Sequence, residues 1–117
     1  MTASKTAMTL KRALETRDAG TLAGLYTRDA TLRVIDRDHP PSMPLVLEGA
    51  PAIIAYYDDM CSREMSHVVE TAIAEGDTVA LTESCRYPNG ARVFCAATMT
   101  LANGKIARQT TIQAWDA

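Results

Sequence analysis

Four side chains of this sequence have the chemistry to move a proton or to hold a charged oxygen: Glu83, Asp36, His67 and Arg108. Glu83 lies in an alternating segment, residues 78–87, on the side that carries the apolar residues, so we expect it on a buried face. Burial raises the pKa of a carboxylic acid and tunes it towards proton transfer near neutral pH. The plainer alternative is that Glu83 faces solvent or pairs with an arginine.

The other three candidates depend on strand register. Asp36 falls on the apolar side of a predicted strand over residues 30–37 and could act at the mouth of a cavity. A surface loop is the alternative for Asp36. His67 begins a later predicted strand and could exchange a proton there, although a structural histidine is the commoner case. Arg108 faces inward, to pair with Glu83 or to bind a carboxylate, if the last strand follows a strict two-residue turn.

The sequence predicts neither a metal nor a cofactor. Its two histidines, His39 and His67, have no zinc-like spacing with the three cysteines, and the possible ligands are dispersed along the chain. His39 lies in a proline-rich loop and could act as a base at the rim, although a loop histidine is more often merely exposed. A net charge of −2 without a basic stripe predicts no nucleic-acid partner.

Composition predicts one domain over residues 1–117, because 47% hydrophobic residues suffice for one core. Three cysteines are too few for a disulfide scaffold, so we expect a reducing, cytoplasmic setting. The apolar runs are too short to cross a membrane, and the N-terminal residues lack the apolar stretch of a signal peptide. We therefore expect no membrane partner.

The elements that must position these residues follow from apolar periodicity. Offsets of three and four predict helices in the first half, whereas a period of two runs from Ser66 onward. Asp18 is the predicted N-cap of a short helix whose apolar face includes Leu22, Leu25 and Tyr26. The predicted elements are helices over residues 3–14, after Asp18 and over 49–63, strands over 30–37 and 45–47, and four further strands over 67–74, 78–87, 92–101 and 105–115.

The hairpin that follows Glu83 decides which side chains face inward. A three-residue loop with a bulge pairs Glu83 with Ala97 and Cys85 with Cys95, and it places all four inward. We favour this register because it buries more apolar surface. A strict two-residue turn flips the register and turns the opposite set inward, namely Thr82, Ser84 and Arg86.

Two other strands have open registers. In the strand over residues 67–74, the side chains expected to face inward are His67, Val69, Thr71 and Ile73. In the last strand, a two-residue turn places inward Arg108, Thr110, Ile112, Ala114 and Asp116. A bulge exchanges that set for Gln109, Thr111, Gln113 and Trp115.

A curved sheet with helices on one side leaves a cavity between the two layers. Its predicted lining is Tyr56, Tyr57, Met60, Cys85, Cys95, Ala97, Met99 and Trp115. The two tyrosines are consecutive in a helix, so we expect only one of them to contact a ligand. The cysteines are interpreted as buried thiols, because no base beside them is evident in the sequence. Trp115 is either a cavity wall or part of a dimer contact.

This order of elements resembles the nuclear transport factor two-like superfamily, in its SnoaL-like and ketosteroid-isomerase-like branches. The residues that carry the resemblance are 18–31 (DAGTLAGLYTRDAT), Glu48-Gly49 leading into 55–57, 103–106 (NGKI) and 113–116 (QAWD). The resemblance implies a cone-shaped α+β barrel, in which three N-terminal helices pack on a strongly curved, mostly antiparallel sheet. It does not imply one activity, because this fold hosts several chemistries.

The catalytic pattern of the ketosteroid isomerases is absent. That family places a tyrosine and two aspartates at positions that correspond here to about Leu10, Val34 and Ala97. Alanine cannot replace a protonated aspartate that donates in an oxyanion hole, so the resemblance does not carry that activity over. It does imply that the helical pair Tyr56 and Tyr57 lines the cavity.

These patterns predict a small-molecule enzyme with an apolar pocket. Cofactor-independent acid–base chemistry of the isomerase, cyclase or hydrolase type, on a hydrophobic oxygenated substrate, needs only the parts named above. The alternatives are a non-catalytic small-molecule-binding protein and a dimeric assembly domain. In each case we expect a homodimer through the outer face of the sheet.

Overall fold

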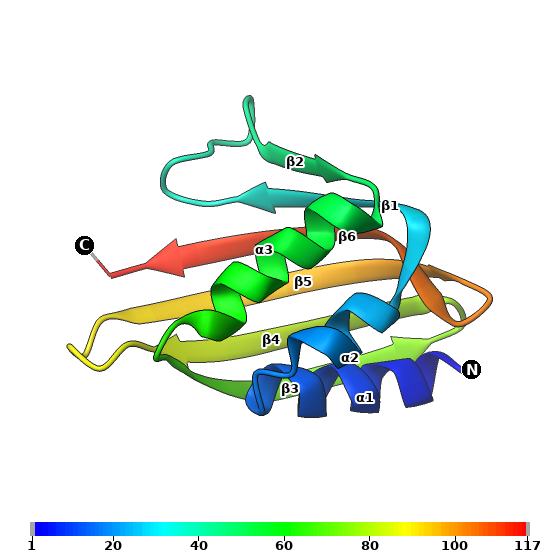
Figure 1. Cartoon of the computed structure of the whole chain (residues 1–117), viewed down its shortest axis with the longest axis horizontal. Helices are drawn as coiled ribbons and strands as arrows, with labels where there is room; N and C mark the ends of the chain where they lie inside the picture. The colour runs from blue at the N-terminus through cyan, green and yellow to red at the C-terminus, as the bar shows by residue number, and fades with distance from the viewer. Residues whose placement is uncertain (1, 117) are drawn as a thin grey trace.

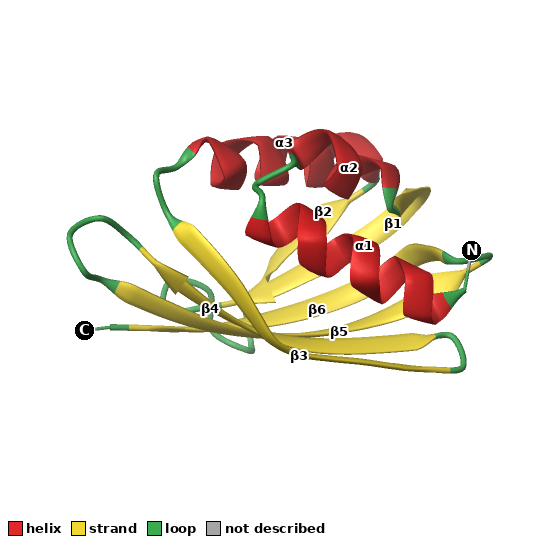
Figure 2. Cartoon of the chain, turned by 90° about the horizontal axis from the view of Figure 1, so that it is seen from below, coloured by secondary structure: helices red, strands yellow, loops and turns green. Residues whose placement is uncertain are grey.

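Three helices cover one face of a six-stranded sheet, as Figures 1 and 2 show. The structure is a computed structural model, and it describes residues 2–116. The elements are α1 (Ala3–Glu15), α2 (Ala19–Gly24), β1 (Tyr26–Ile35), β2 (Leu45–Glu48), α3 (Ala50–Ser62), β3 (Ser66–Glu75), β4 (Thr78–Arg86), β5 (Arg92–Ala102) and β6 (Lys105–Trp115). The strand order is β2-β1-β6-β5-β4-β3, and among these strands only β1 and β6 pair in parallel. The predicted α+β fold with a curved, mostly antiparallel sheet is confirmed.

Local signals in the sequence set where the helices begin. The side chain of Asp18 accepts a hydrogen bond from the backbone N–H of Thr21 at 3.1 Å, so the predicted N-cap of α2 is confirmed. Helix α3 begins after Gly49, whose φ of +89° is a conformation that glycine adopts without strain. Pro51 stands in the first turn of α3, where its missing N–H costs no helical hydrogen bond.

The boundary between α2 and β1 differs from the prediction. Tyr26 begins β1 instead of extending the apolar face of α2, which ends at Gly24. The reason is pairing with a distant strand: the backbone N–H of Ile106 donates to the carbonyl of Leu25 at 2.7 Å, and Tyr26 pairs with Ile106. Pairing with β6 therefore places Tyr26 in the sheet, because tertiary pairing overrides a short helical pattern.

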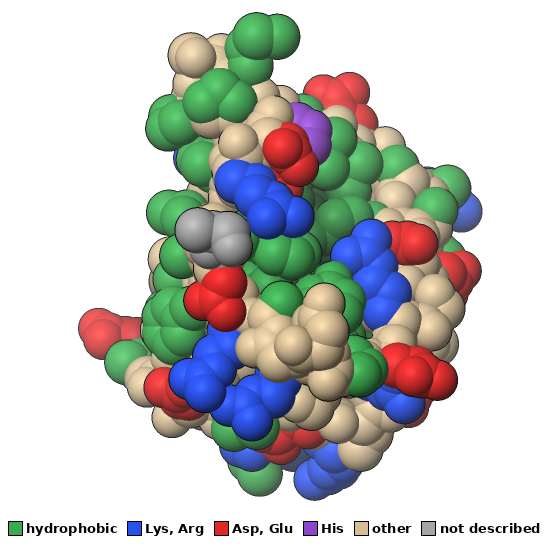
Figure 3. All heavy atoms as spheres, turned by 90° about the vertical axis from the view of Figure 1, so that its left-hand side faces the viewer, with side chains coloured by type: hydrophobic (Ala, Val, Ile, Leu, Met, Phe, Trp, Pro, Cys, Tyr) green, Lys and Arg blue, Asp and Glu red, His purple; other side chains and the backbone are tan. Residues whose placement is uncertain are grey.

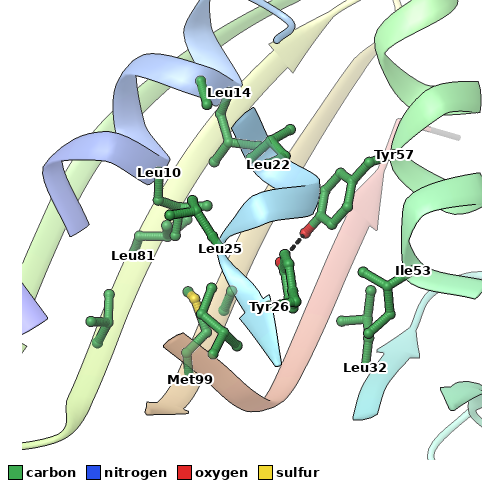
Figure 4. Close-up of a cluster of buried hydrophobic side chains, with 14 of the residues drawn as sticks. Leu10, Leu14, Leu22, Leu25, Tyr26, Leu32, Ile53, Tyr57, Leu81 and Met99 are labelled. Atoms are coloured by element: carbon green, nitrogen blue, oxygen red, sulfur yellow. Dashed lines mark hydrogen bonds between the residues drawn. The ribbon is translucent and has the colours of Figure 1, made fainter. Parts of the chain in front are cut away.

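Large apolar side chains from both layers meet in one core, shown in Figure 4. Leu10 of α1, Leu22 of α2 and Ile53 of α3 are each at most 1% exposed. They lie in one cluster with Leu32 of β1 and Met99 of β5, which are buried to the same degree. Each such side chain contributes about 1.5–3 kcal/mol through burial, so this cluster is the main force that holds the helices on the sheet.

A bulge in β3 exchanges the two faces of that strand halfway along. Val69 pairs with Glu83, but Thr71 pairs with Thr82, so one extra residue lies between them. His67 and Val69, before the bulge, are buried as predicted. The inward placement of Thr71 and of Ile73, a residue that is 58% exposed, is wrong because both follow the bulge.

A second bulge sets the register of β6. Thr100 pairs with Arg108, whereas the next residue, Leu101, pairs with Ile106. The extra residue exchanges the faces of β6 relative to a strict two-residue turn. Arg108 is therefore exposed, and its predicted inward position is wrong. The alternative set faces inward instead: Gln109, Thr111, Gln113 and Trp115.

The β4–β5 hairpin keeps the predicted faces but shifts the partners by two residues. Glu83 pairs with Cys95 rather than with Ala97, and Cys85 pairs with Val93 rather than with Cys95. The loop holds three residues, because the N–H of Tyr87 donates to the carbonyl of Ala91 at 2.9 Å. A shift of two residues leaves every side chain on its original face, so Glu83 and Cys85 remain buried as predicted.

The outer face of the sheet carries exposed apolar side chains. Val68, Ile73, Phe94 and Ile112 are each between 44% and 58% exposed. The homodimer predicted through this face stays a prediction. Among the described helices, none is both long and apolar enough to span a membrane.

We predict that Thr6→Val lowers the free energy of unfolding by about 1–3 kcal/mol, the cost of leaving a buried carbonyl unpaired. The buried Thr6 hydroxyl donates to the carbonyl of Gly104 at 2.6 Å and joins α1 to the β5–β6 turn. Urea unfolding measures the effect. The exposed Thr16, which makes a comparable bond to Arg12 within α1, is the control; equal losses in Thr6→Val and Thr16→Val contradict this role of the buried bond.

Candidate active site

A cavity of about 440 Å³ opens at the end of the molecule that Figure 3 faces, where apolar side chains lie between basic and acidic ones. The predicted residues on its wall are Asp36, Tyr56, Met60, His67, Glu83, Cys85, Cys95 and Trp115. A smaller cavity of about 40 Å³ shares Tyr56, Met60, Glu83 and Cys95 with it and adds Tyr57, Ala97 and Met99. All eight side chains predicted to line a cavity therefore do so, and their role in ligand binding stays a prediction.

The outer face also has a hollow, and it is larger, at about 700 Å³. This hollow is lined by Val68 and Phe94 and by residues at the ends of strands, such as Ser66 and Arg86. Neither Glu83 nor His67 lines it. We place the candidate site in the inner cavity because the groups that can move a proton converge there.

Glu83 and His67 form a buried pair at the wall of the inner cavity. His67 Nδ1 lies 3.1 Å from Glu83 Oε2, and the two side chains are 0% and 7% exposed. Strands β3 and β4 bring them together: His67 pairs with Cys85, two residues from Glu83 on the same face. The sequence indicated that each could face inward, but not that they touch.

The hydrogen bonds with Cys85 and Glu83 keep His67 protonated in spite of its burial. Burial alone lowers the pKa of His67, but its hydrogen bonds to Cys85 and Glu83 and the negative charge of Glu83 outweigh burial and raise the pKa from 6.5 to about 9. The pair at neutral pH is therefore an imidazolium that donates through Nδ1 to a carboxylate. The other ring nitrogen, Nε2, is buried and has no hydrogen-bond partner among the described residues.

Cys85 lies against the same ring nitrogen, with Sγ 3.3 Å from His67 Nδ1. A nucleophilic triad needs the thiol and the acid on opposite nitrogens of the imidazole, and here both contact Nδ1. A hydrogen bond with Cys95 and burial raise the pKa of the Cys85 thiol. Cys85 is therefore a neutral thiol, in line with the interpretation from the sequence.

The same three groups bear on metal binding. His67, Glu83 and Cys85 each offer one ligand atom, and these atoms lie within 4.8 Å of one another. The expectation that possible ligands are dispersed is wrong for this cluster. A divalent cation such as Zn²⁺ accepts nitrogen, sulfur and oxygen ligands of this kind, so these residues could hold one. Without a cation, Glu83 and Cys85 both contact His67 through its Nδ1, and His67 Nε2 keeps no partner among the described residues.

The remaining predicted groups lie apart from this pair. Asp36 follows β1 at the mouth of the cavity, where its Oδ1 lies 2.9 Å from Nδ1 of His39. Asp36 and His39 thus form a second acid–histidine pair, which is partly exposed. Arg108 is exposed on β6, a strand two places from β4 in the sheet, and does not reach Glu83.

Neutral polar side chains line the opposite side of the cavity. Gln113 Nε2 donates to the Tyr56 hydroxyl at 3.2 Å, and Trp115 Nε1 donates to Gln113 Oε1 at 3.1 Å. Deeper in the protein, Tyr26 donates to Gln109 Oε1 at 2.6 Å. The two glutamines were not among the predicted site residues; the signal for them is the alternation of polar residues along β6, which depends on the bulge.

The fold of three helices on a curved sheet is shared by solved structures. An NTF2-like protein of unknown function from Burkholderia xenovorans LB400 has a TM-score of 0.82 at 17% identity, with 98% of this chain and 84% of that chain covered. One from Mesorhizobium loti has a TM-score of 0.81 at 15% identity, with 96% and 93% covered. SalBIII, described as an epoxide hydrolase/cyclase-like enzyme with a role in pyran ring formation in the polyether salinomycin, has a TM-score of 0.75 at 20% identity, with 96% and 90% covered. These likenesses establish the fold alone.

The chain belongs to the SnoaL-like domain family, whose sequence profile matches residues 9–109. The predicted resemblance is thereby confirmed. The family includes isomerases and cyclases, and many structural relatives have no assigned function. Among the curated proteins, none matches this chain.

The buried pair predicts a particular pH dependence of stability. Because the pKa of His67 is about 9 in the folded protein and 6.5 as its ordinary value, the pair stabilises the protein fully below about pH 6.5, and the contribution is lost as the pH rises through 9. At about 1.4 kcal/mol per pKa unit, the loss is roughly 3 kcal/mol by pH 10.

Urea unfolding at pH 6 and pH 10 tests this dependence in the wild type and in His67→Gln. We expect the free energy of unfolding to fall more steeply in the wild type, because other titrating groups contribute equally to both proteins. Parallel pH profiles for the two proteins contradict the proposed imidazolium–carboxylate pair.

Proposed function

We propose that this protein is a cofactor-independent enzyme that transfers a proton within a hydrophobic, oxygen-bearing small molecule, with Glu83 as the base and His67 as its partner. The observation that carries this proposal is the buried pair between these two side chains at the wall of the cavity. A paired carboxylate and imidazolium offer a proton acceptor and a proton donor in one place. Isomerisation and cyclisation need no more than this.

The two oxygens of Glu83 have different surroundings. Oε2 is bound by His67, whereas Oε1 accepts no hydrogen bond from the described residues. Oε1 is therefore the atom proposed to take a proton from the substrate, while His67 holds the carboxylate in place. The proton then returns from Glu83 to a second atom of the same molecule, so no other reactant is consumed.

The wall of the cavity supports a hydrophobic substrate. Met60, Val93, Cys95 and Trp115 present apolar surface around the pair. Burial of apolar surface supplies most of the affinity in sites of this kind, and a few polar groups fix the orientation. The likeness to SalBIII adds support by analogy for cyclase-type chemistry; the size of the cavity, about 440 Å³, admits a molecule of two or three rings.

Proton transfer can be tested without knowledge of the natural substrate. A panel of apolar ketones is incubated with the protein in D₂O, and deuterium uptake at the carbon beside the carbonyl is followed by mass spectrometry. We predict that Glu83→Gln lowers the catalysed exchange rate by about 10²- to 10⁴-fold, the usual contribution of a general base. His67→Gln is expected to lower it less, because the carboxylate remains.

Glu70→Gln is the matched control, since Glu70 is exposed at the bulge of β3 and outside the inner cavity. Full exchange in Glu83→Gln, or binding of the ketones without exchange in the wild type, overturns the proposed chemistry; the second result favours a binding protein. Exchange should also survive a chelator. Its loss on chelation and return with Zn²⁺ would instead place the chemistry on a cation held by the His67 cluster.

A further inference from the structure

The donors and acceptors of the hydrogen bonds around Tyr56 can be assigned in only one way. The indole N–H of Trp115 can only donate, so Gln113 must present its carbonyl oxygen to it, at 3.1 Å. The amide N–H₂ of Gln113 therefore points the other way and donates to the Tyr56 oxygen at 3.2 Å. The hydroxyl hydrogen of Tyr56 is left without an acceptor among the described residues.

The neighbouring tyrosine has no such free hydrogen. Tyr26 donates its hydroxyl hydrogen to Gln109 Oε1 at 2.6 Å, so Tyr57, whose oxygen lies 2.8 Å from that of Tyr26, must donate to Tyr26. Both hydrogens of this inner pair are thus used within the protein. Of these three tyrosines, Tyr56 alone keeps a donor for a ligand, and it lines both inner cavities.

The sheet places this donor opposite the base. Glu83 on β4 pairs with Cys95 on β5, which pairs with Gln113 on β6, so the three residues form one row across the inner face. Neighbouring strands are about 4.8 Å apart, and the small side chain of Cys95 lies between the two polar ends of the row. A molecule that lies over Cys95 can meet Glu83 at one end and the Tyr56 hydroxyl at the other.

We propose that the Tyr56 hydroxyl binds and stabilises the substrate's oxygen, with Gln113 and Trp115 as positioning residues, and that the substrate is an apolar ketone or aldehyde. The inference rests on the proposed function. As Glu83 Oε1 takes the proton from the carbon beside the carbonyl, the electron pair of that C–H bond forms the C=C bond of an enolate, and the π pair of the C=O bond moves onto the oxygen. Tyr56 donates to that oxygen, and both electron pairs return when Glu83 gives the proton back.

The surroundings keep this donor protonated. Burial and the proximity of Tyr57 and Cys95 raise the pKa of Tyr56, while its bond from Gln113 only partly offsets them. A neutral phenol is therefore the form present near neutral pH, as a donor to a developing oxyanion requires.

Binding of 2-acetylnaphthalene and of its hydrocarbon analogue 2-ethylnaphthalene tests the assignment without any turnover. NMR titration gives the two dissociation constants, and infrared spectroscopy gives the carbonyl stretch of the bound ketone. In Tyr56→Phe we predict about fivefold weaker binding of the ketone, the loss of one hydrogen bond, and unchanged binding of the hydrocarbon. The carbonyl stretch, shifted to lower frequency in the wild type, should return to its value in an apolar solvent.

Three further variants distinguish an effect of hydrogen-bond direction from an effect of packing. Tyr57→Phe, the matched control, should keep the ketone affinity and the shifted stretch although it loses a buried hydrogen bond. Gln113→Glu retains Tyr56 but offers it a carboxylate acceptor, so the hydroxyl hydrogen should turn to the glutamate and the shift of the carbonyl stretch should disappear. Trp115→Phe should reduce the shift in part, because the Gln113 amide is then free to turn over.

An unshifted stretch in the wild type, or a shifted stretch in Tyr56→Phe, overturns the assignment of Tyr56 and leaves the proton transfer by Glu83 intact. Failure of both naphthalenes to bind the wild type overturns the apolar ligand itself, and with it the proposed function. Equal loss of ketone and hydrocarbon binding in Tyr56→Phe shows a packing role only and also overturns the inference.

Discussion

The alternation of side chains along a strand is the constraint on which this site depends. Successive inward positions along a strand are two residues apart, and a single extra residue moves every later side chain to the opposite face. The bulge at Glu70 of β3 and the one at Ala107 of β6 each add such a residue. The first leaves His67 and Val69 inside and turns Thr71 and Ile73 outward. The second brings the glutamines of β6 to the cavity and sends Arg108 to solvent.

The cavity has two electrostatic halves as a result. One half, on β3 and β4, holds an ionised pair that is shielded from water, where charge–charge attraction is strongest. On the opposite side, Tyr56 of α3 and Gln113 and Trp115 of β6 are neutral donors and acceptors, and the charged pair of Asp59 and Arg63 beside them is exposed to solvent. The cysteines and Met60 between them fill space without adding charge. A site divided in this way can bind an uncharged molecule and still place the charged carboxylate of Glu83 beside one of its atoms.

More of the fold than of the candidate site could be predicted from the sequence. The caps, the proline in the first turn of α3 and the period of two after Ser66 are local signals, and the helices and strands follow from them. Glu83 could be placed inward because the two possible hairpins differ in buried apolar area. The outward position of Arg108 and the contact of His67 with Glu83 both depend on bulges. The position of a bulge cannot be located from the local pattern of a single sequence. The start of β1 at Tyr26 depends on a strand eighty residues away, which no local window contains.

The position of β6 in the sheet also governs the order in which the chain can fold. This strand is the last of those described, yet it stands third in the sheet and alone joins β1 and β2 to the other three strands. The first two strands have no neighbour on their inner edge until β6 arrives. During synthesis, β1 and β2 therefore keep an unpaired strand edge until β6 has been made, and unpaired edges of this kind promote aggregation. Such long-range closure also belongs to proteins that fold slowly.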